Sequence, residues 1–196
     1  AQQARAHGQE FISKQLIGKN ADHAGDPAFV EQPRKFGLVY ISSSPESVTI
    51  NESFADDLRA DGADIVEVLP YQLDPATVQS QASQIIAKLK ASGVTSVIFI
   101  SDGIAPRDFT KEATTQEYRP EWILVAPALS DLTAFARTYD QDQWAHAFGV
   151  TSGAVPVTPE ETGYYALYEW WKGAPPQAND TIGLLMPNFT LFYAVT

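Results

Sequence analysis

The sequence predicts an α/β protein with a three-layer, mostly parallel open sheet flanked by helices on both faces. Two observations carry this prediction. Amphipathic and β-branched segments alternate along the chain, as they do when parallel strands are joined by helical crossovers. The clearest strand, residues 94–100 (VTSVIFI), is short, rich in β-branched residues and apolar on both faces, which is typical of a strand covered on both sides.

The segment before that strand justifies the first helix–strand unit. Asp74 is expected to cap a helix whose first residue is Pro75, because proline at the first position loses no hydrogen bond. An apolar stripe follows at helical spacing, formed by Val78, Ala82, Ile85, Ile86 and Leu89. Gly93 allows the left-handed turn that ends a helix, and Ser101, Asp102 and Gly103 follow the strand.

The same patterns assign the rest of the chain. Strands are predicted at residues 36–41, 64–69, 94–100, 122–125 and 147–150. Helices are predicted at residues 4–16, 50–61, 75–92, 132–139 and 158–172, with a short one after Pro106. Ser130 is expected to start the helix at 132–139, and Thr158 with Glu161 to form a capping box.

Three regions are expected along the chain. Residues 1–35 form a lead-in helix and a linker arm, and residues 36–173 form an α/β ligand-binding lobe. Residues 174–196 form a loop and a segment that returns toward another lobe. Both ends of the sequence read as cut from a longer protein, a fragment in this interpretation.

Composition excludes several functional classes. Hydrophobic residues make up 44% and charged residues 19%, which favours a folded domain over disorder. Thirteen Lys and Arg against 24 Asp and Glu give a formal net charge of −11, which argues against nucleic acid or an anionic membrane as the main partner. The absence of cysteine excludes disulfides and thiol catalysis.

Candidate binding residues follow the predicted strands. In open parallel sheets, ligands bind beyond the carboxyl ends of the strands, near the point where the strand order reverses. The loops at that edge contain Ser42, Ser43, Ser44, Tyr71, Ser101, Asp102, Gly103, Ala128, Ser130, Asp131 and residues 151–153. Each polar residue also has a structural alternative: the serines can form a turn and a cap, Asp102 a turn before Gly103, and Asp131 a favourable charge at a helix start.

No complete catalytic apparatus is visible. His7, His23 and His146 lack metal-ligand spacing, and Ser152 with Gly153 lacks the motif that exposes a nucleophile. No glycine-rich phosphate loop follows the first strand. We therefore expect no enzyme activity, no catalytic residue, no metal and no cofactor.

The chain resembles the second lobe of type I periplasmic binding proteins, the solute receptors of ABC transporters for branched-chain amino acids and similar ligands. The matching segments are RKFGLVYISSS, FADDLRADGADI, QASQIIAKLKASGVTSVIFISDG, PEWILVAPALSD and YYALYEWWKG, and they cover roughly residues 5–173. In this family two lobes close on a ligand about a hinge. The resemblance implies that the first lobe lies outside this sequence.

The resemblance also implies a site and partners. Ligand contacts would come from Ser42, Ser43 and Ser44, from Ser101 and Asp102, and from Ala128, Ser130 and Asp131. The implied solute is small and polar, such as an amino acid or an amide, and it would be passed to an ABC transporter permease from an extracytoplasmic location, either the periplasm or a cell-surface lipoprotein. Amino-acid receptors of this family often place a tyrosine and an acidic group in these loops to bind the ligand's ammonium. Here Asp102 could supply the acid, but the tyrosine, Tyr71, follows the second strand rather than the first, third or fourth. On the resemblance, this departure argues against an amino acid.

Two alternatives remain open on the sequence. A flavodoxin-like α/β enzyme would hold a cofactor in the same loops. A sensor domain would use the same lobe without a transporter.

Overall fold

The structure is a computed structural model that describes residues 2–151 and 158–177. The chain divides into two compact units, Ala1–Ser152 and Gly153–Thr196. The first unit contains the sheet. Most of the predicted return segment, from residue 178 onward, lies outside the described residues, as do residues 152–157.

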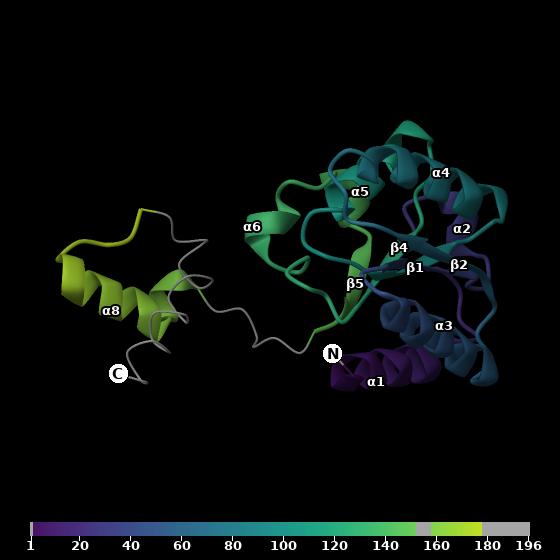
Figure 1. Ribbon diagram of the computed structural model, residues 1–196, viewed down its shortest axis with the longest axis horizontal. Helices are drawn as coiled ribbons and strands as arrows, with labels where there is room; N and C mark the ends of the chain where they lie inside the picture. Colours follow the sequence, from purple (N-terminus) through teal and green to yellow (C-terminus); the bar gives the residue numbers. More distant parts are fainter. Residues whose placement is uncertain (1, 152–157, 178–196) are drawn as a thin grey trace. The chain divides into compact units, whose positions relative to one another are not determined.

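The first unit is built on a five-stranded sheet in which every strand pair is parallel (Figure 1). The strands are β1 (Phe36–Ile41), β2 (Ile65–Tyr71), β3 (Ser96–Ile100), β4 (Glu121–Val125) and β5 (Ala147–Val150). Their order across the sheet is β2-β1-β3-β4-β5. The predicted fold class is therefore confirmed.

Helices cover both faces of this sheet. The helices of the first unit are α1 (Gln2–Phe11), which continues as the π-helix η1 (Ile12–Leu16), α2 (Pro27–Val30), α3 (Pro45–Ala60), α4 (Val78–Ala91), α5 (Pro106–Thr115), α6 (Thr133–Ala136) and α7 (Gln141–Trp144). Figure 1 shows α4 and α5 on one face of the sheet and α1 and α3 on the other. This gives the three layers that the sequence predicts.

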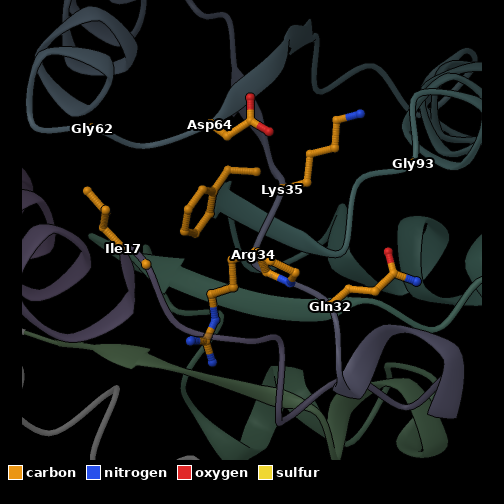
Figure 2. Close-up of a pocket in the computed structure, with 10 residues that line it drawn as sticks. Ile17, Gln32, Arg34, Lys35, Gly62, Asp64 and Gly93 are labelled. Carbon is orange, nitrogen blue, oxygen red and sulfur yellow. The ribbon is translucent and has the colours of Figure 1, made fainter.

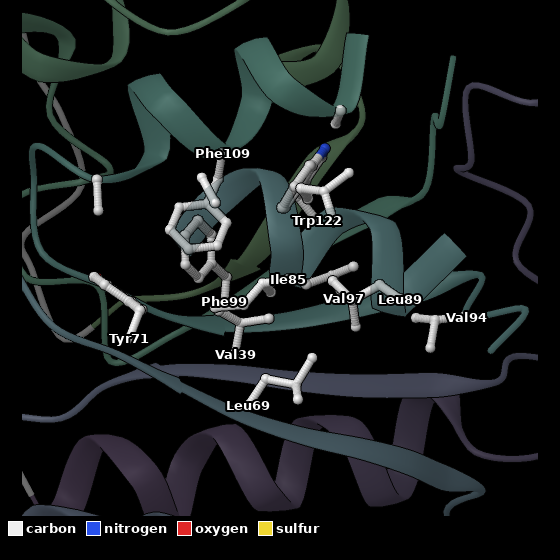
Figure 3. Close-up of a cluster of buried hydrophobic side chains, with 14 of the residues drawn as sticks. Val39, Leu69, Tyr71, Ile85, Leu89, Val94, Val97, Phe99, Phe109 and Trp122 are labelled. Carbon is white, nitrogen blue, oxygen red and sulfur yellow. The ribbon is translucent and has the colours of Figure 1, made fainter. Parts of the chain in front are cut away.

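The core under α4 and α5 is rich in aromatic rings (Figure 3). The ring centroid of Phe99 on β3 lies 5.2 Å from the ring centroid of Phe109 on α5 and 5.7 Å from that of Trp122 on β4. The predicted stripe of α4, including Ile85 and Leu89, is buried in the same cluster. Burying side chains of this size stabilises the fold by about 1.5–3 kcal/mol each.

On the opposite face, α1 and α3 pack against the other side of the same strands. Leu58 of α3 and Ile12 of η1 are buried in a second cluster with Leu38 and Ile98. Gly8 lets α1 approach the sheet closely, since a Cβ there would overlap the side chain of Val125. The first helix is therefore part of the sheet's cover.

Three of the local predictions that differ from the structure concern the ends of elements near Pro70, Asp74 and Ser130. Strand β2 continues through Pro70 to Tyr71, because β2 is an edge strand and the missing N–H of proline costs no ladder bond there. Helix α4 begins at Val78 rather than Pro75, since Asp74 instead accepts from the amide of Ala76 in a preceding turn. Ser130 does not cap the next helix, whose N-cap residue is Leu132.

A buried ion pair anchors the segment before β1. Arg34 donates two hydrogen bonds of 2.8 Å to the carboxylate of Glu121 at the start of β4, and both side chains are buried. Asp22 accepts a further bond from Arg34, and Ser96 donates to Glu121. Burial alone would lower the pKa of Arg34, but the bonds and charges of Glu121 and Asp22 outweigh burial and raise it.

The second unit contains one described α-helix. The 3₁₀ turn η2 (Pro159–Glu161) precedes α8 (Gly163–Lys172). Thr158 does bond to Glu161, but the helix itself is capped by Thr162 and ends at Gly173 in the left-handed conformation. Among the described residues, no helix is both long and apolar enough to cross a membrane.

Candidate functional site

The candidate site is the edge of the sheet where the parallel strands end. From β1 the chain moves to β2 on one side and then to β3 on the other, so the strand order reverses between β1 and β3. Such a reversal leaves a crevice in which ligands of open α/β sheets bind. We call the loops at this edge the carboxyl rim, defined as residues 42–44, 72–77, 101–105 and 126–132.

A hydrogen bond from Tyr71 to Asp102 links two strands across the end of β1. The Tyr71 hydroxyl lies 2.7 Å from Oδ2 of Asp102, and it also accepts from the Asp102 amide at 3.2 Å. Tyr71 is itself buried. Burial, with the charge and hydrogen bond of Asp102, raises the pKa of Tyr71 well above its ordinary value, so this hydroxyl stays a donor.

The second carboxylate oxygen of Asp102 shapes the loop after β3. Its Oδ1 accepts from the amides of Ile104 at 2.6 Å and Ala105 at 2.9 Å. Both oxygens of Asp102 are therefore occupied by protein donors. This arrangement is the turn-forming alternative considered from the sequence, and it makes Asp102 a residue that positions the rim.

The loop after β4 packs against the loop after β3. The Tyr139 hydroxyl donates to the carbonyl oxygen of Gly103 at 2.7 Å. A Cβ on Gly103 would lie 3.2 Å from the Cβ of Leu129, which shows how closely the two loops approach. Ala126 and Leu129 have φ values of +51° and +69°, a left-handed conformation that costs non-glycine residues energy and often marks functional loops.

Two buried hydroxyls in this region have no hydrogen-bond partner among the described residues. They belong to Ser101, which is 2% exposed, and Ser130, which is fully buried. A buried polar group without a partner costs about 1–3 kcal/mol, so natural proteins rarely retain one without a reason. Both were predicted as ligand-binding residues from the sequence.

The serines after β1 are largely occupied by the start of α3. Ser44 is the N-cap: its hydroxyl accepts from the Ser47 amide, while the Ser47 hydroxyl accepts from the amides of Ser43 and Ser44. The Ser42 amide donates to the carbonyl of Tyr71. Hydrogen bonds from its own amide and from Ser44 lower the pKa of Glu46, so a carboxylate already sits at this helix start and disfavours a bound phosphate.

The structure brings several predicted site residues into one network. Tyr71, Ser101, Asp102 and Ala128 are connected by the contacts above and by a bond from the Ala128 amide to the Ser101 carbonyl, 3.4 Å long. Ser42, Ser43 and Ser44 lie at the same edge. Asp131 is exposed. The pKa of Tyr139 is raised mainly by burial, then by the charge of Asp102, and then by the charge of Asp131.

Sequence reasoning missed the contact of Tyr139 with the rim. Its position in an apolar helical pattern indicated a core residue, and nothing local to the sequence shows that its hydroxyl reaches Gly103. Of the predicted loop at residues 151–153, only Thr151 is among the described residues.

A separate cavity lies at the other edge of the sheet (Figure 2). Its volume is about 340 Å³, and it is lined by Ile17, Gly18, Gln32, Pro33, Arg34, Lys35, Phe36, Gly62, Asp64 and Gly93. These residues stand at the amino ends of β1, β2 and β3, where helices end. The cavity is thus distinct from the carboxyl rim.

Metal-ligating groups are not gathered anywhere in residues 2–151 or 158–177. Of the three histidines, His146 contacts the backbone carbonyl of His23 through its ring. That contact is structural.

Comparisons with known proteins place the fold. The chain matches no model of a known protein family and no curated protein sequence. A fatty acid ABC transporter substrate-binding protein from Thermomonospora curvata matches with a TM-score of 0.55 at 16% identity over 90% of this chain. A branched chain amino acid ABC transporter periplasmic ligand-binding protein from Burkholderia xenovorans matches with a TM-score of 0.50 at 16% identity over 76% of this chain.

A third solved structure gives the same picture. A solute binding protein of an ABC transporter from R. palustris, in complex with benzoate, matches with a TM-score of 0.50 at 13% identity over 93% of this chain. The chain spans only 41%, 38% and 44% of these three proteins, respectively. At these identities the likeness establishes the fold, which is that of one lobe of a type I periplasmic binding protein, as the resemblance in the sequence predicted.

Proposed function

We propose that this chain forms one wall of the ligand cleft of an extracytoplasmic solute-binding protein, and that the protein delivers its solute to an ABC transporter permease. The observation that carries the proposal is the carboxyl rim. Loops from β2, β3 and β4 meet there through specific contacts at the reversal of strand order.

The similar solved structures support this proposal in two ways. Their names describe ligand-binding, substrate-binding and solute-binding proteins of ABC transporters, and none describes an enzyme. Each is also more than twice as long as the part that this chain matches. In this proposal the other lobe supplies the facing wall, and residues 174–196 lead toward it.

Within the proposed site, the predicted residues have two roles. Asp102 and Tyr71 position the rim, while Ser42, Ser43, Ala128 and Asp131 lie where a bound solute would contact it. The hydroxyls of Ser101 and Ser130 are buried in the same region. Ser44 serves both as the cap of α3 and as part of the rim.

Calorimetric titration of the full-length protein tests the proposal. The panel comprises branched-chain amino acids, fatty acids, aromatic carboxylates, amides and sugars. We expect saturable one-to-one binding of at least one class, with the solute recovered unchanged. Chemical turnover of the solute, or a flavin or nucleotide released from the purified protein, would instead support the flavodoxin-like enzyme.

A further inference from the structure

The cavity at the amino edge of the sheet is bounded by the carboxyl ends of three helices. In a parallel sheet each crossover helix runs opposite to the strands, so it ends where the next strand begins. Gly18 follows α1 with η1, Gly62 follows α3 and Gly93 follows α4. All three glycines line the cavity in the left-handed conformation. Helix carboxyl ends carry partial negative charge, so this edge attracts cations.

Two charged side chains of this cavity have no partner among the described residues. The ammonium of Lys35 and the carboxylate of Asp64 form no hydrogen bond or ion pair with each other or with any other residue that the structure describes. Figure 2 shows both on one side of the cavity, while Arg34 is directed away from them and bonds to Glu121. The cavity therefore contains a cation and an anion that are not paired.

A purely structural role accounts for Lys35 but not for Asp64. A Cβ on Gly93 would lie 3.9 Å from the Lys35 ammonium, so this positive charge lies near the carboxyl end of α4 and is stabilised there. Asp64 is exposed and follows the carboxyl end of α3, where a negative charge is unfavourable. The basic residue in the last turn of α3, Arg59, bonds to the Ile65 carbonyl and to a carboxylate of its own helix. Asp64 therefore adds negative charge to an edge that is already negative.

We propose that this cavity is a second binding site, and that its ligand is a small zwitterion with an ammonium group and an anionic group joined by a short aliphatic chain. Asp64 and the ends of η1 and α3 bind the ammonium, and Lys35 binds the anionic group. Ile17 and Pro33 provide apolar surface for the chain, and the volume of about 340 Å³ is that of a small-ligand site. The helix ends disfavour a simple anion, and Lys35 disfavours a simple cation.

Titration of the 196-residue chain with ω-amino acids of two to six carbons tests the proposal. The comparison probes are alkylamines and alkyl carboxylates of the same lengths, each of which carries one of the two charges. Backbone amide signals in NMR spectra report where each probe binds. We expect saturable shifts at Gly18, Gly62 and Gly93 with the zwitterions, and an affinity about tenfold lower for either singly charged series.

Four variants locate the two charged contacts. Lys35→Met and Asp64→Asn each remove one charge from the cavity, so each should weaken binding of the best zwitterion roughly fivefold to tenfold. Lys111→Met and Asp142→Asn are the matched controls, since both residues are exposed and lie outside the cavity. They should leave the affinity unchanged. Because Lys35 and Asp64 make no side-chain bond to a described residue, all four variants should fold, with unfolding midpoints close to that of the unsubstituted protein.

The outcomes separate this site from the proposed solute site, because the cavity and the carboxyl rim share no residue. Shifts confined to the rim would support the proposed function and overturn the second site. Full affinity in Lys35→Met or Asp64→Asn would also overturn it, as would an alkylamine that binds as tightly as the zwitterion of the same length. If no probe shifted the cavity amides, the second site would fail and the proposed function would stand.

Discussion

The hydroxyl of Tyr71, the last residue of the edge strand β2, lies 2.7 Å from the carboxylate of Asp102, which follows the central strand β3. The bond passes over the end of β1, so three adjacent strands are tied together at the edge where a ligand is proposed to bind. Asp102 in turn holds the amides of Ile104 and Ala105. The shape of the carboxyl rim therefore depends on a side chain two strands away.

Tyr71→Phe should loosen the rim and lower stability by about 1–2 kcal/mol, because a buried hydroxyl that both donates and accepts is lost. Urea unfolding measures the stability, and titration of the full-length protein measures affinity for its solute. Tyr118→Phe is the control: Tyr118 is buried and donates to the Val94 carbonyl at the other end of β3. It should cost similar stability without weakening solute binding, whereas Tyr71→Phe should weaken it.

Glu121→Gln should be strongly destabilising, by about 3–5 kcal/mol, because it removes the buried charged partner of the Arg34 guanidinium and leaves only the exposed Asp22. Urea unfolding at pH 7 measures the change. In a double-mutant cycle, Arg34→Met combined with Glu121→Gln should cost less than the sum of the two single changes. Glu10→Gln, which removes an exposed pair with Lys14, should leave the midpoint essentially unchanged.

Glu67 should make stability depend on pH in the acidic range. Its partial burial raises the pKa, but hydrogen bonds from Ser92 and Lys88 and the charge of Lys88 outweigh burial, so the folded-state pKa is lowered. A lowered pKa contributes stability above the unfolded value of about 4.3, and this contribution is lost as pH falls through the folded value.

Glu67→Gln should therefore destabilise the protein at pH 7 by about 0.5–1 kcal/mol, and the difference from the unsubstituted protein should shrink as pH falls below about 5. Urea midpoints measured between pH 7 and pH 3 give the two curves. A gap that stayed constant down to pH 3 would contradict the assignment. Ser92→Ala removes one donor to Glu67. It should therefore show a smaller loss of stability at pH 7 than Glu67→Gln, and this loss should also shrink as pH falls.

Gly149→Ala should detach or distort strand β5. A Cβ at this position would overlap the carbonyl oxygen of Leu124 on β4, a backbone atom that cannot rotate away. We expect a loss of about 2–3 kcal/mol, typical of overpacking. A Cβ on Gly18 would have no neighbouring atom within 4 Å, and the only penalty is the left-handed backbone at this position. Gly18→Ala should therefore lower the free energy of unfolding by about 1 kcal/mol. Equal losses in the two variants would show that the contact with Leu124 does not limit the substitution.

The sheet could be predicted well from the sequence because each strand is marked by its own local pattern of apolar residues. Phe36–Ile41 is apolar at most positions and has the predicted bounds, and Gly93 ends a helix in the left-handed conformation as expected. Pro70 was misleading, since proline normally ends a strand. It is tolerated in β2 because β2 pairs on one side only.

The site was harder to predict because its geometry depends on contacts between distant segments. The loops after β1, β3 and β4 could be located from the strand order expected of parallel sheets. The hydrogen bond from Tyr71 to Asp102 could not be predicted, because it requires Tyr71 to lie at the end of β2, which is two strands away from β3 in the sheet. Periodicity also assigns Tyr139 to a core face, and only the folded structure shows its hydroxyl at Gly103.

The packing of α1 has a consequence for how the chain folds during synthesis. The ring of Phe11 meets that of Phe148 on β5 with centroids 6.4 Å apart, so the first helix of the chain rests partly on the last strand of the sheet. The ribosome must therefore make almost the whole first unit before α1 can complete its contacts. Such non-local contacts slow folding and expose apolar surface meanwhile. The nascent chain should therefore depend on chaperone protection until β5 has emerged.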